Sequence, residues 1–325
     1  MDINVIIHQM IILFILIGLG YLLNKVHILG PKIDKGITGL ILYCTMPAMI
    51  LGAVVTNENE HDVKLALGCL LVAACMYIIL PVIAYFLVRI MRIKPGLRGI
   101  YQFMIIFGNV GFMGFPIIAA LFGEESVVYG SIFNIFFNLL VYSYGIIIVM
   151  KDKEEAAKAA ENGENNADND SVEKFRFTWT KLLTPGISVA VLALIIFFID
   201  IDFPDVIVSP IASLGNITSP LAMLIIGSTL ANMDIREVFN DVRVYVFVAI
   251  RFFVLPLALF PLLNLIIKDS FLLQLTMIML LMPVANTTVL YAKQYGSDEN
   301  LAAKSIFIST LLSIVTIPLV AYICF

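Results

Sequence analysis

Hydrophobic positions along this chain are gathered in long apolar runs of about 20 residues, and short polar segments separate these runs. A helix of that length rises about 30 Å and is long enough to cross the hydrocarbon core of a bilayer. The pattern therefore predicts an all-α polytopic membrane protein with ten transmembrane helices. The predicted spans are 5–24, 36–55, 64–90, 98–122, 126–150, 184–200, 205–231, 242–267, 271–293 and 299–325.

One polar segment, residues 151–181, is much longer than the others and lies at mid-chain. Its first residues, from Lys151 to Ala157, can extend the fifth helix by two or three turns. The run Glu161–Asn166 is too polar to bury a core and is typical of a flexible linker. We therefore expect a first five-helix repeat over 1–150, a cytoplasmic flexible linker over 151–181 and a second five-helix inverted repeat over 182–325.

Composition agrees with a membrane protein, because 61% of the 325 residues are hydrophobic and only 14% are charged. A soluble domain carries about 25% charged residues. The four cysteines lie in apolar runs, and the three histidines are scattered. We therefore expect no metal, no cofactor and no nucleic-acid partner. A Gly-x-Ser-x-Gly elbow, a His-Glu-x-x-His motif and paired membrane aspartates are all missing from the sequence, so we do not expect an enzyme.

The basic residues predict an orientation in the cell membrane, plasma or inner. With the N-terminus outside, 17 of the 20 lysines and arginines fall on the inner side of the ten predicted spans, and only Lys64 and Lys268 fall outside. The remaining one, Arg251, lies within a span. Cytoplasmic loops are enriched in Lys and Arg, so both termini are expected to be extracytoplasmic and the linker cytoplasmic.

The two halves resemble each other at an offset of 173 to 175 residues. Because each half has five spans, an odd number, the second half must start on the opposite side of the membrane and be inverted. Inverted repeats are typical of secondary transporters, since two pseudo-symmetric conformations expose one site to either side. Some channels share this arrangement. The matching pairs are Pro47 with Pro220, Pro81 with Pro256, Gly123 with Gly296, and 131–133 with 305–307.

Helix-breaking residues interrupt the fourth and ninth spans at corresponding places. Three glycines and Pro116 lie within 108–116, and Pro283 lies in the run Met282–Thr288. We expect both helices to unwind there. Such breaks persist in a membrane only where protein buries them or where they line an aqueous cavity. The offset of 174 places Asn109 on Pro283, so we expect helices 4 and 9 to cross at their breaks, as transporter binding sites often do.

The predicted crossing favours an anion. Two helix N-termini would meet there and offer unpaired N–H groups and positive dipole ends. No Asp or Glu lies well inside a predicted span. The expected substrate-binding residues are Asn109, Gly111, Pro116, Pro283, Asn286, Thr287, Thr288 and Arg251.

The role of Arg251 and the coupling ion stay open at this level. Arg251 can attract substrate, cap carbonyl groups freed near Pro256, or snorkel toward the cytoplasm. Only His8 offers an intramembrane group for proton coupling. Sodium can bind backbone carbonyls and hydroxyls at the breaks, and a uniporter driven by the membrane potential is equally allowed.

The interrupted spans and several other motifs resemble the auxin efflux carrier family, in its bacterial organic-anion permease branch, within the bile/arsenite/riboflavin transporter superfamily. Asn109, Gly114 and Pro116 match the family's fourth span. The similarity covers nearly the whole chain except the linker. Further matches are Pro220–Met223 with Gly227, Ile250–Phe252 with Pro256, Pro283 with 292–295, and 309–313 with Thr316 and Pro318.

The resemblance implies a scaffold of spans 1, 2, 6 and 7 that forms a homodimer, and a mobile elevator-type transport domain of spans 3–5 and 8–10. It places the substrate carboxylate at the crossing, near Asn109. Plant members have a second proline where this chain has Thr288, which argues against auxin itself as the assumed substrate.

We therefore expect a secondary carrier of a small organic anion, such as malate, malonate or an auxin-like acid, that works by alternating access. Two alternatives remain: a sodium-coupled bile-acid-type symporter, and a membrane sensor without transport.

Overall fold

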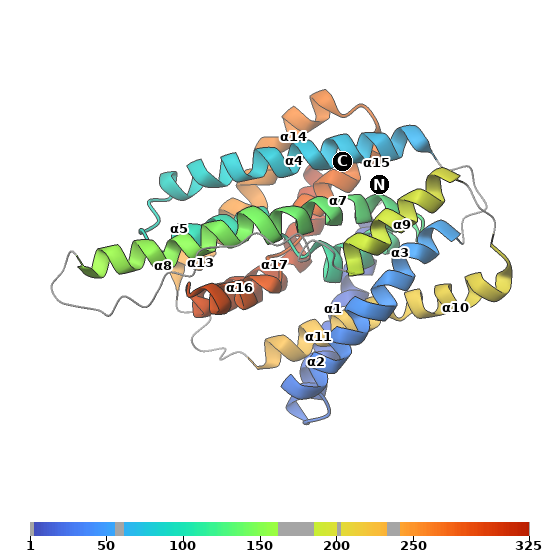
Figure 1. Ribbon diagram of the computed structural model, residues 1–325, viewed down its shortest axis with the longest axis horizontal. Helices are drawn as coiled ribbons and strands as arrows, with labels where there is room; N and C mark the ends of the chain where they lie inside the picture. The colour runs from blue at the N-terminus through green and yellow to red at the C-terminus, as the bar shows by residue number, and fades with distance from the viewer. Residues whose placement is uncertain (1–2, 56–61, 162–184, 200–202, 233–240, 325) are drawn as a thin grey trace.

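The computed structural model describes residues 3–55, 62–161, 185–199, 203–232 and 241–324 (Figure 1). Every regular element within these ranges is helical, apart from one two-residue bridge. Residues 162–181 of the predicted linker lie outside the described residues, as do 182–184 at the start of the second repeat. The part of the predicted linker that is described, 151–161, is helical, as expected for an extension of the fifth helix.

The helices of the first half follow the predicted apolar runs closely. Three of the runs also contain a π-helical turn, a wider turn that often marks a functional site. The elements are α1 (Ile3–Lys25), α2 (Pro31–Leu40), η1 (Ile41–Thr45), α3 (Met46–Val55), α4 (Val63–Ile90), α5 (Arg98–Ile106), η2 (Val110–Gly114), α6 (Phe115–Phe122), α7 (Ser126–Leu140), η3 (Val141–Gly145) and α8 (Ile146–Glu161).

The second half has the same kinds of element. Its described residues contain one π-helical turn, η5, which holds Arg251. The elements are α9 (Pro185–Ile199), α10 (Asp205–Asn216), α11 (Thr218–Ala231), α13 (Val242–Ala249), η5 (Ile250–Val254), α14 (Leu255–Ile266), α15 (Ser270–Leu280), α16 (Thr287–Tyr295) and α17 (Glu299–Cys324).

Within the described ranges, six helical runs are long and apolar enough to cross a membrane: 31–55, 63–90, 126–152, 205–231, 242–266 and 299–324. Four shorter apolar helical runs accompany them, at 11–25, 110–122, 188–199 and 270–280. The helical architecture of the described residues is therefore consistent with a multi-pass membrane protein.

Local sequence chemistry sets several helix starts. The carboxylates of Asp62 and Asp269 accept hydrogen bonds from the backbone N–H groups of Leu65 (3.0 Å) and Leu272 (2.8 Å), which caps α4 and α15. Three of the π-helical turns, η1, η2 and η5, end two residues before a proline: Pro47, Pro116 and Pro256. A proline has no N–H and its ring clashes with the preceding turn, so the helix widens just before it.

The helices pack in two groups. In the first, α1 packs on α11, and α3 packs on α9 and α10. In the second, α4 packs on α5 and α7, and α17 packs on α13, α14 and α16. Figure 1 shows the first group toward the lower right, and α4 and α14 along the opposite, upper edge. Contacts between α1 and α6, α3 and α7, and α11 and η2 join the two groups.

Glycines bring α1 and α11 into backbone contact. A methyl group added at Gly20 would overlap the carbonyl oxygen of Leu224, and one added at Gly227 would overlap that of Ile17. Small residues permit such approach between membrane helices. A buried hydrogen-bond chain extends the contact to α2, because Asn24 Nδ2 donates to Ser228 Oγ (2.8 Å) and Ser228 Oγ donates to Asp34 Oδ2 (2.6 Å).

Candidate functional site

Two unwound segments cross near the middle of the second helix group. The first, 107–109, separates α5 from η2, and the second, 281–286, separates α15 from α16. They pair as a short antiparallel bridge: Asn109 N donates to Pro283 O (2.7 Å), and Ala285 N donates to Phe107 O (3.1 Å). The predicted interruptions are present, and each supplies hydrogen-bond partners to the other.

The residues at the bridge suit this close approach. Gly108 faces Met282, whose carbonyl oxygen would lie 3.0 Å from an added Cβ, so a larger residue would push the segments apart. Val284 N donates to Ser309 Oγ of α17 (3.1 Å), which satisfies a backbone group that the bridge leaves free. Buried backbone groups in a membrane protein need such partners.

The unwinding in the fourth span is shorter and lies earlier than the glycine pattern predicted. Gly111 lies in η2, and Pro116 lies in the first turn of α6, so neither is part of the unwound segment. The π-helical turn absorbs the glycines, and a proline in the first turn of a helix removes only an N–H group that has no intrahelical partner anyway.

In the ninth span, Pro283 lies in the unwound segment, and Thr287 and Thr288 form the first turn of α16. Asn286 is at the N-cap position of this helix but makes no capping hydrogen bond with its side chain. Two helices, η2 with α6 and α16, therefore begin next to the crossing. Their first N–H groups lack intrahelical partners, as at any helix start.

Two polar side-chain groups at the crossing have no hydrogen-bond partner among the described residues. They are Nδ2 of Asn109, a residue that is only 4% exposed, and Oγ1 of Thr287. The hydroxyl of Thr288, in contrast, donates to Ala285 O (2.7 Å). Buried polar groups are normally paired, so Asn109 and Thr287 are the groups here with capacity left for a ligand.

Arg251 is 1% exposed and does not snorkel to a surface. Its Nη1 donates to the carbonyl oxygen of Leu280 (2.7 Å), the last residue of α15 before the unwound segment. Its Nε has no partner among the described residues. The carbonyl group that Arg251 caps thus belongs to the neighbouring broken helix, and not to the turn near Pro256.

Comparison with known proteins identifies the family of the chain. The profile of a family described as membrane transport protein matches residues 5–321, nearly the whole chain. The chain belongs to this family, that of the auxin efflux carriers. An uncharacterized transporter of Methanocaldococcus jannaschii is 25% identical over 321 residues, which cover 96% of this chain and 97% of the relative.

In this member of the membrane transport protein family, an aromatic cluster packs beside the crossing. The ring centroids of Phe103 and Phe107 are 4.5 Å apart, those of Phe103 and Tyr291 5.2 Å, and those of Phe107 and Phe137 5.4 Å. Sequence reasoning missed this cluster, because aromatic residues are common throughout the apolar runs and carry no positional signal.

Asp152 was also missed as a structural residue. It is 1% exposed and accepts hydrogen bonds from Gly99 N (2.7 Å), Ile100 N (2.8 Å) and Ser297 Oγ (2.9 Å). A carboxylate is stabilised at a helix N-terminus, here that of α5. Asp152 thereby ties α8 to both broken spans. Its place in a charged run gave no sign of burial.

The crossing faces the first helix group. A Cβ added at Gly111 would lie 3.3 Å from Met46 Cε, so η2 packs directly against α3. A cavity of about 150 Å³ lies farther along the same boundary, lined by Met49 and Gly52 of α3, by Gly215 of α10 and by Glu124. Desolvation there raises the pKa of the Glu124 carboxyl above its ordinary value, so it binds a proton more readily than an exposed glutamate.

Proposed function

We propose that this protein is a secondary transporter that moves a small organic anion, a carboxylate such as malate, malonate or an auxin-like acid, by alternating access. The carboxylate binds at the crossing of the broken fourth and ninth helices. The observation that carries the proposal is the unpaired, 4% exposed Asn109 amide beside the starts of two helices.

The chemistry of the crossing favours an anion over a cation. The Asn109 amide and the Thr287 hydroxyl can donate hydrogen bonds, and the starts of η2 and α16 add positive dipole ends. The buried carboxylates Asp34 and Asp152 lie in other contacts and are already hydrogen-bonded. Arg251, next to the second break, adds a positive field without pairing to a carboxylate among the described residues.

We further propose ten spans in two inverted halves, formed by the six long and four short apolar runs together. The hydrogen bonds between the unwound segments of the fourth and ninth spans support this repeat, because the two segments occupy corresponding places in the two halves. The first helix group would serve as a scaffold that forms a homodimer, and the second as a mobile elevator-type transport domain. Both termini would be extracytoplasmic. The small cavity at Glu124 supports movement along this boundary, because the packing there is incomplete.

The test is uptake of labelled malate and malonate into proteoliposomes by the wild type and Asn109→Ala. A hydrogen bond to a charged group is worth about 1.5–3 kcal/mol, so uptake should fall about tenfold or more. Asn264→Ala is the matched control, because Asn264 is exposed on α14 and should leave uptake unchanged.

Each other outcome has a defined meaning. Unchanged uptake by Asn109→Ala would place the binding site elsewhere. Uptake that requires a sodium gradient would favour the bile-acid-type symporter. Binding of carboxylates without any flux through the wild type would favour a sensor over a transporter.

A further inference from the structure

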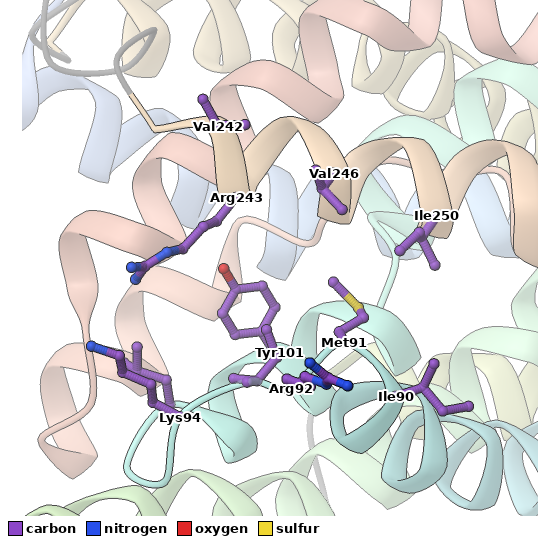
Figure 2. Close-up of a pocket in the computed structure, with 11 residues that line it drawn as sticks. Ile90, Met91, Arg92, Lys94, Tyr101, Val242, Arg243, Val246 and Ile250 are labelled. Atoms are coloured by element: carbon purple, nitrogen blue, oxygen red, sulfur yellow. The ribbon is translucent and has the colours of Figure 1, made fainter.

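A second pocket, of about 400 Å³, lies away from the crossing, where the end of α4 meets the start of α13 (Figure 2). The loop between α4 and α5 and the side chain of Tyr101 complete its wall. None of the residues proposed to bind substrate lines it. Its elements all belong to the helix group that carries the broken helices, but on the side away from α1 and α11 (Figure 1).

The walls of this pocket are apolar and open outward. Ile90 is 76% exposed, Val242 72% and Val246 49%, and Ile250 continues the wall along α13. Ile90 and Val242 lie at the ends of two membrane-crossing runs, 63–90 and 242–266. The pocket therefore lies at the level where acyl chains meet lipid headgroups.

Three cations line the pocket: Arg92, Lys94 and Arg243. Figure 2 shows Arg243 and Lys94 on one side of Tyr101 and Arg92 on the other side, beside Met91 and Ile90, with Val246 and Ile250 farther along α13. Within the described part of the chain, none of the three is ion-paired to a carboxylate. Two nearby acids are hydrogen-bonded to backbone groups: Asp241 Oδ1 accepts from the N–H of Arg243 (3.0 Å), and Glu155 Oε2 accepts from the N–H of Gly96 (3.0 Å).

The backbone at Arg92 points to a reason for this arginine other than folding. Arg92 has φ of 54°, in the left-handed region, just after α4 ends. Ile93 N donates to Val88 O (3.0 Å), which closes the helix end. Glycine is the residue that normally fills such a position, since a side chain there is strained.

We infer that this pocket binds an anionic phospholipid. The headgroup phosphate contacts Arg92, Lys94 and Arg243, and an acyl chain lies along Ile90, Val246 and Ile250. Clusters of Lys and Arg beside membrane helices attract anionic lipids, and the apolar wall fits a chain that a soluble phosphate lacks. Such a lipid would bridge α4 of the first half to α13 of the second.

The experiment is native mass spectrometry of the delipidated protein titrated with dioleoylphosphatidylglycerol or dioleoylphosphatidylcholine. The wild type should retain the anionic lipid preferentially. The variant Arg92→Gly/Lys94→Gln/Arg243→Gln should lose that preference, by about fivefold for each cation removed. Glycine is chosen at Arg92 because it suits the left-handed backbone. The control is Lys32→Gln/Lys35→Gln/Lys151→Gln, which removes the same charge from exposed residues and should keep the preference.

A second variant covers the case in which the triple variant does not fold. Val246→Trp keeps all three cations but fills the apolar wall, and it should also weaken retention. Equal retention of both lipids by the wild type would overturn the inference, as would a preference that survives in both variants. Full displacement of the lipid by inorganic phosphate would also overturn it, because the occupant would then be a soluble anion. Because the pocket shares no residue with the crossing, failure here leaves the transport proposal intact.

Discussion

The contact between α1 and α11 and the crossing of the two broken helices solve the problem of burying backbone in a membrane in opposite ways. In the first, both helices keep their internal hydrogen bonds, and Gly20 and Gly227 let them touch. In the second, the helices stop, and residues 107–109 and 283–285 bond to each other. The first contact joins two intact helices, whereas the second leaves Asn109 Nδ2 and Thr287 Oγ1 without partners among the described residues.

This difference indicates where stability and function are separated. At the α1–α11 contact both helices keep their internal hydrogen bonds and their backbones touch, so little room is left for a ligand between them. A crossing that leaves donors unpaired is less stable alone and improves when an acceptor arrives. Substitutions should therefore damage folding at the α1–α11 contact and binding at the crossing.

The largest effect is expected from Gly227→Val. The added side chain would overlap the backbone of Ile17 in a contact with no room to adjust. Overpacking of this kind costs about 3 kcal/mol or more. Size-exclusion chromatography in detergent should show loss of the monodisperse protein. Gly18→Ala, on α1 but with nothing within 4 Å of an added Cβ, should behave as wild type. A monodisperse, heat-stable Gly227→Val protein would show that the contact is not rigid.

The sequence was a good guide to features that are encoded locally. Span length follows from apolar run length, and the breaks follow from Gly108 and Pro283, which cannot continue a buried helix at low cost. It was a poor guide to what only tertiary structure decides. The carbonyl group that accepts a hydrogen bond from Arg251 belongs to Leu280, which is 29 residues away in the sequence. Asp152 accepts a hydrogen bond from the backbone N–H of Gly99, which is 53 residues away in the sequence.

The position of the break within the fourth span shows the limit of such rules. Gly111 and Pro116 indicated unwinding, yet both lie in helical turns after the break. The same residues permit either a π-helical turn or an unwound segment, and packing against Met282 and Met46 selects between them. A proline therefore indicates that a helix is interrupted nearby, but not at which residue.

An intermediate effect is expected from Arg251→Met. The lost hydrogen bond to Leu280 costs about 1 kcal/mol of folding stability. Removing a buried charge that has no carboxylate partner among the described residues also removes its desolvation cost, which offsets that loss. The thermal midpoint should therefore change by only about 2 °C. The apparent KM for a dicarboxylate should rise about tenfold, or about 1.4 kcal/mol, because the positive field is lost.

Arg89→Met is the control for this change, since Arg89 is exposed and its guanidinium only stacks on Tyr85 and bonds the carbonyl of that residue. Its KM should match that of the wild type. A midpoint lowered by more than about 6 °C with an unchanged KM would make Arg251 a helix cap alone.

The smallest and sharpest effect separates two neighbouring threonines. Thr287→Val removes a buried hydroxyl that has no partner among the described residues, so stability should hold or rise while the Kd for the anion rises about fivefold. Thr288→Val removes a hydroxyl that already donates to Ala285 O, so stability should fall by about 1 kcal/mol while the Kd stays constant. Isothermal titration with the transported acid and thermal unfolding measure the two quantities.

The two substitutions make the same chemical change at adjacent positions of α16. Opposite responses would therefore depend only on whether the hydroxyl already donates a hydrogen bond within the protein. Equal responses would mean that the unpaired groups at the crossing are not kept for a ligand.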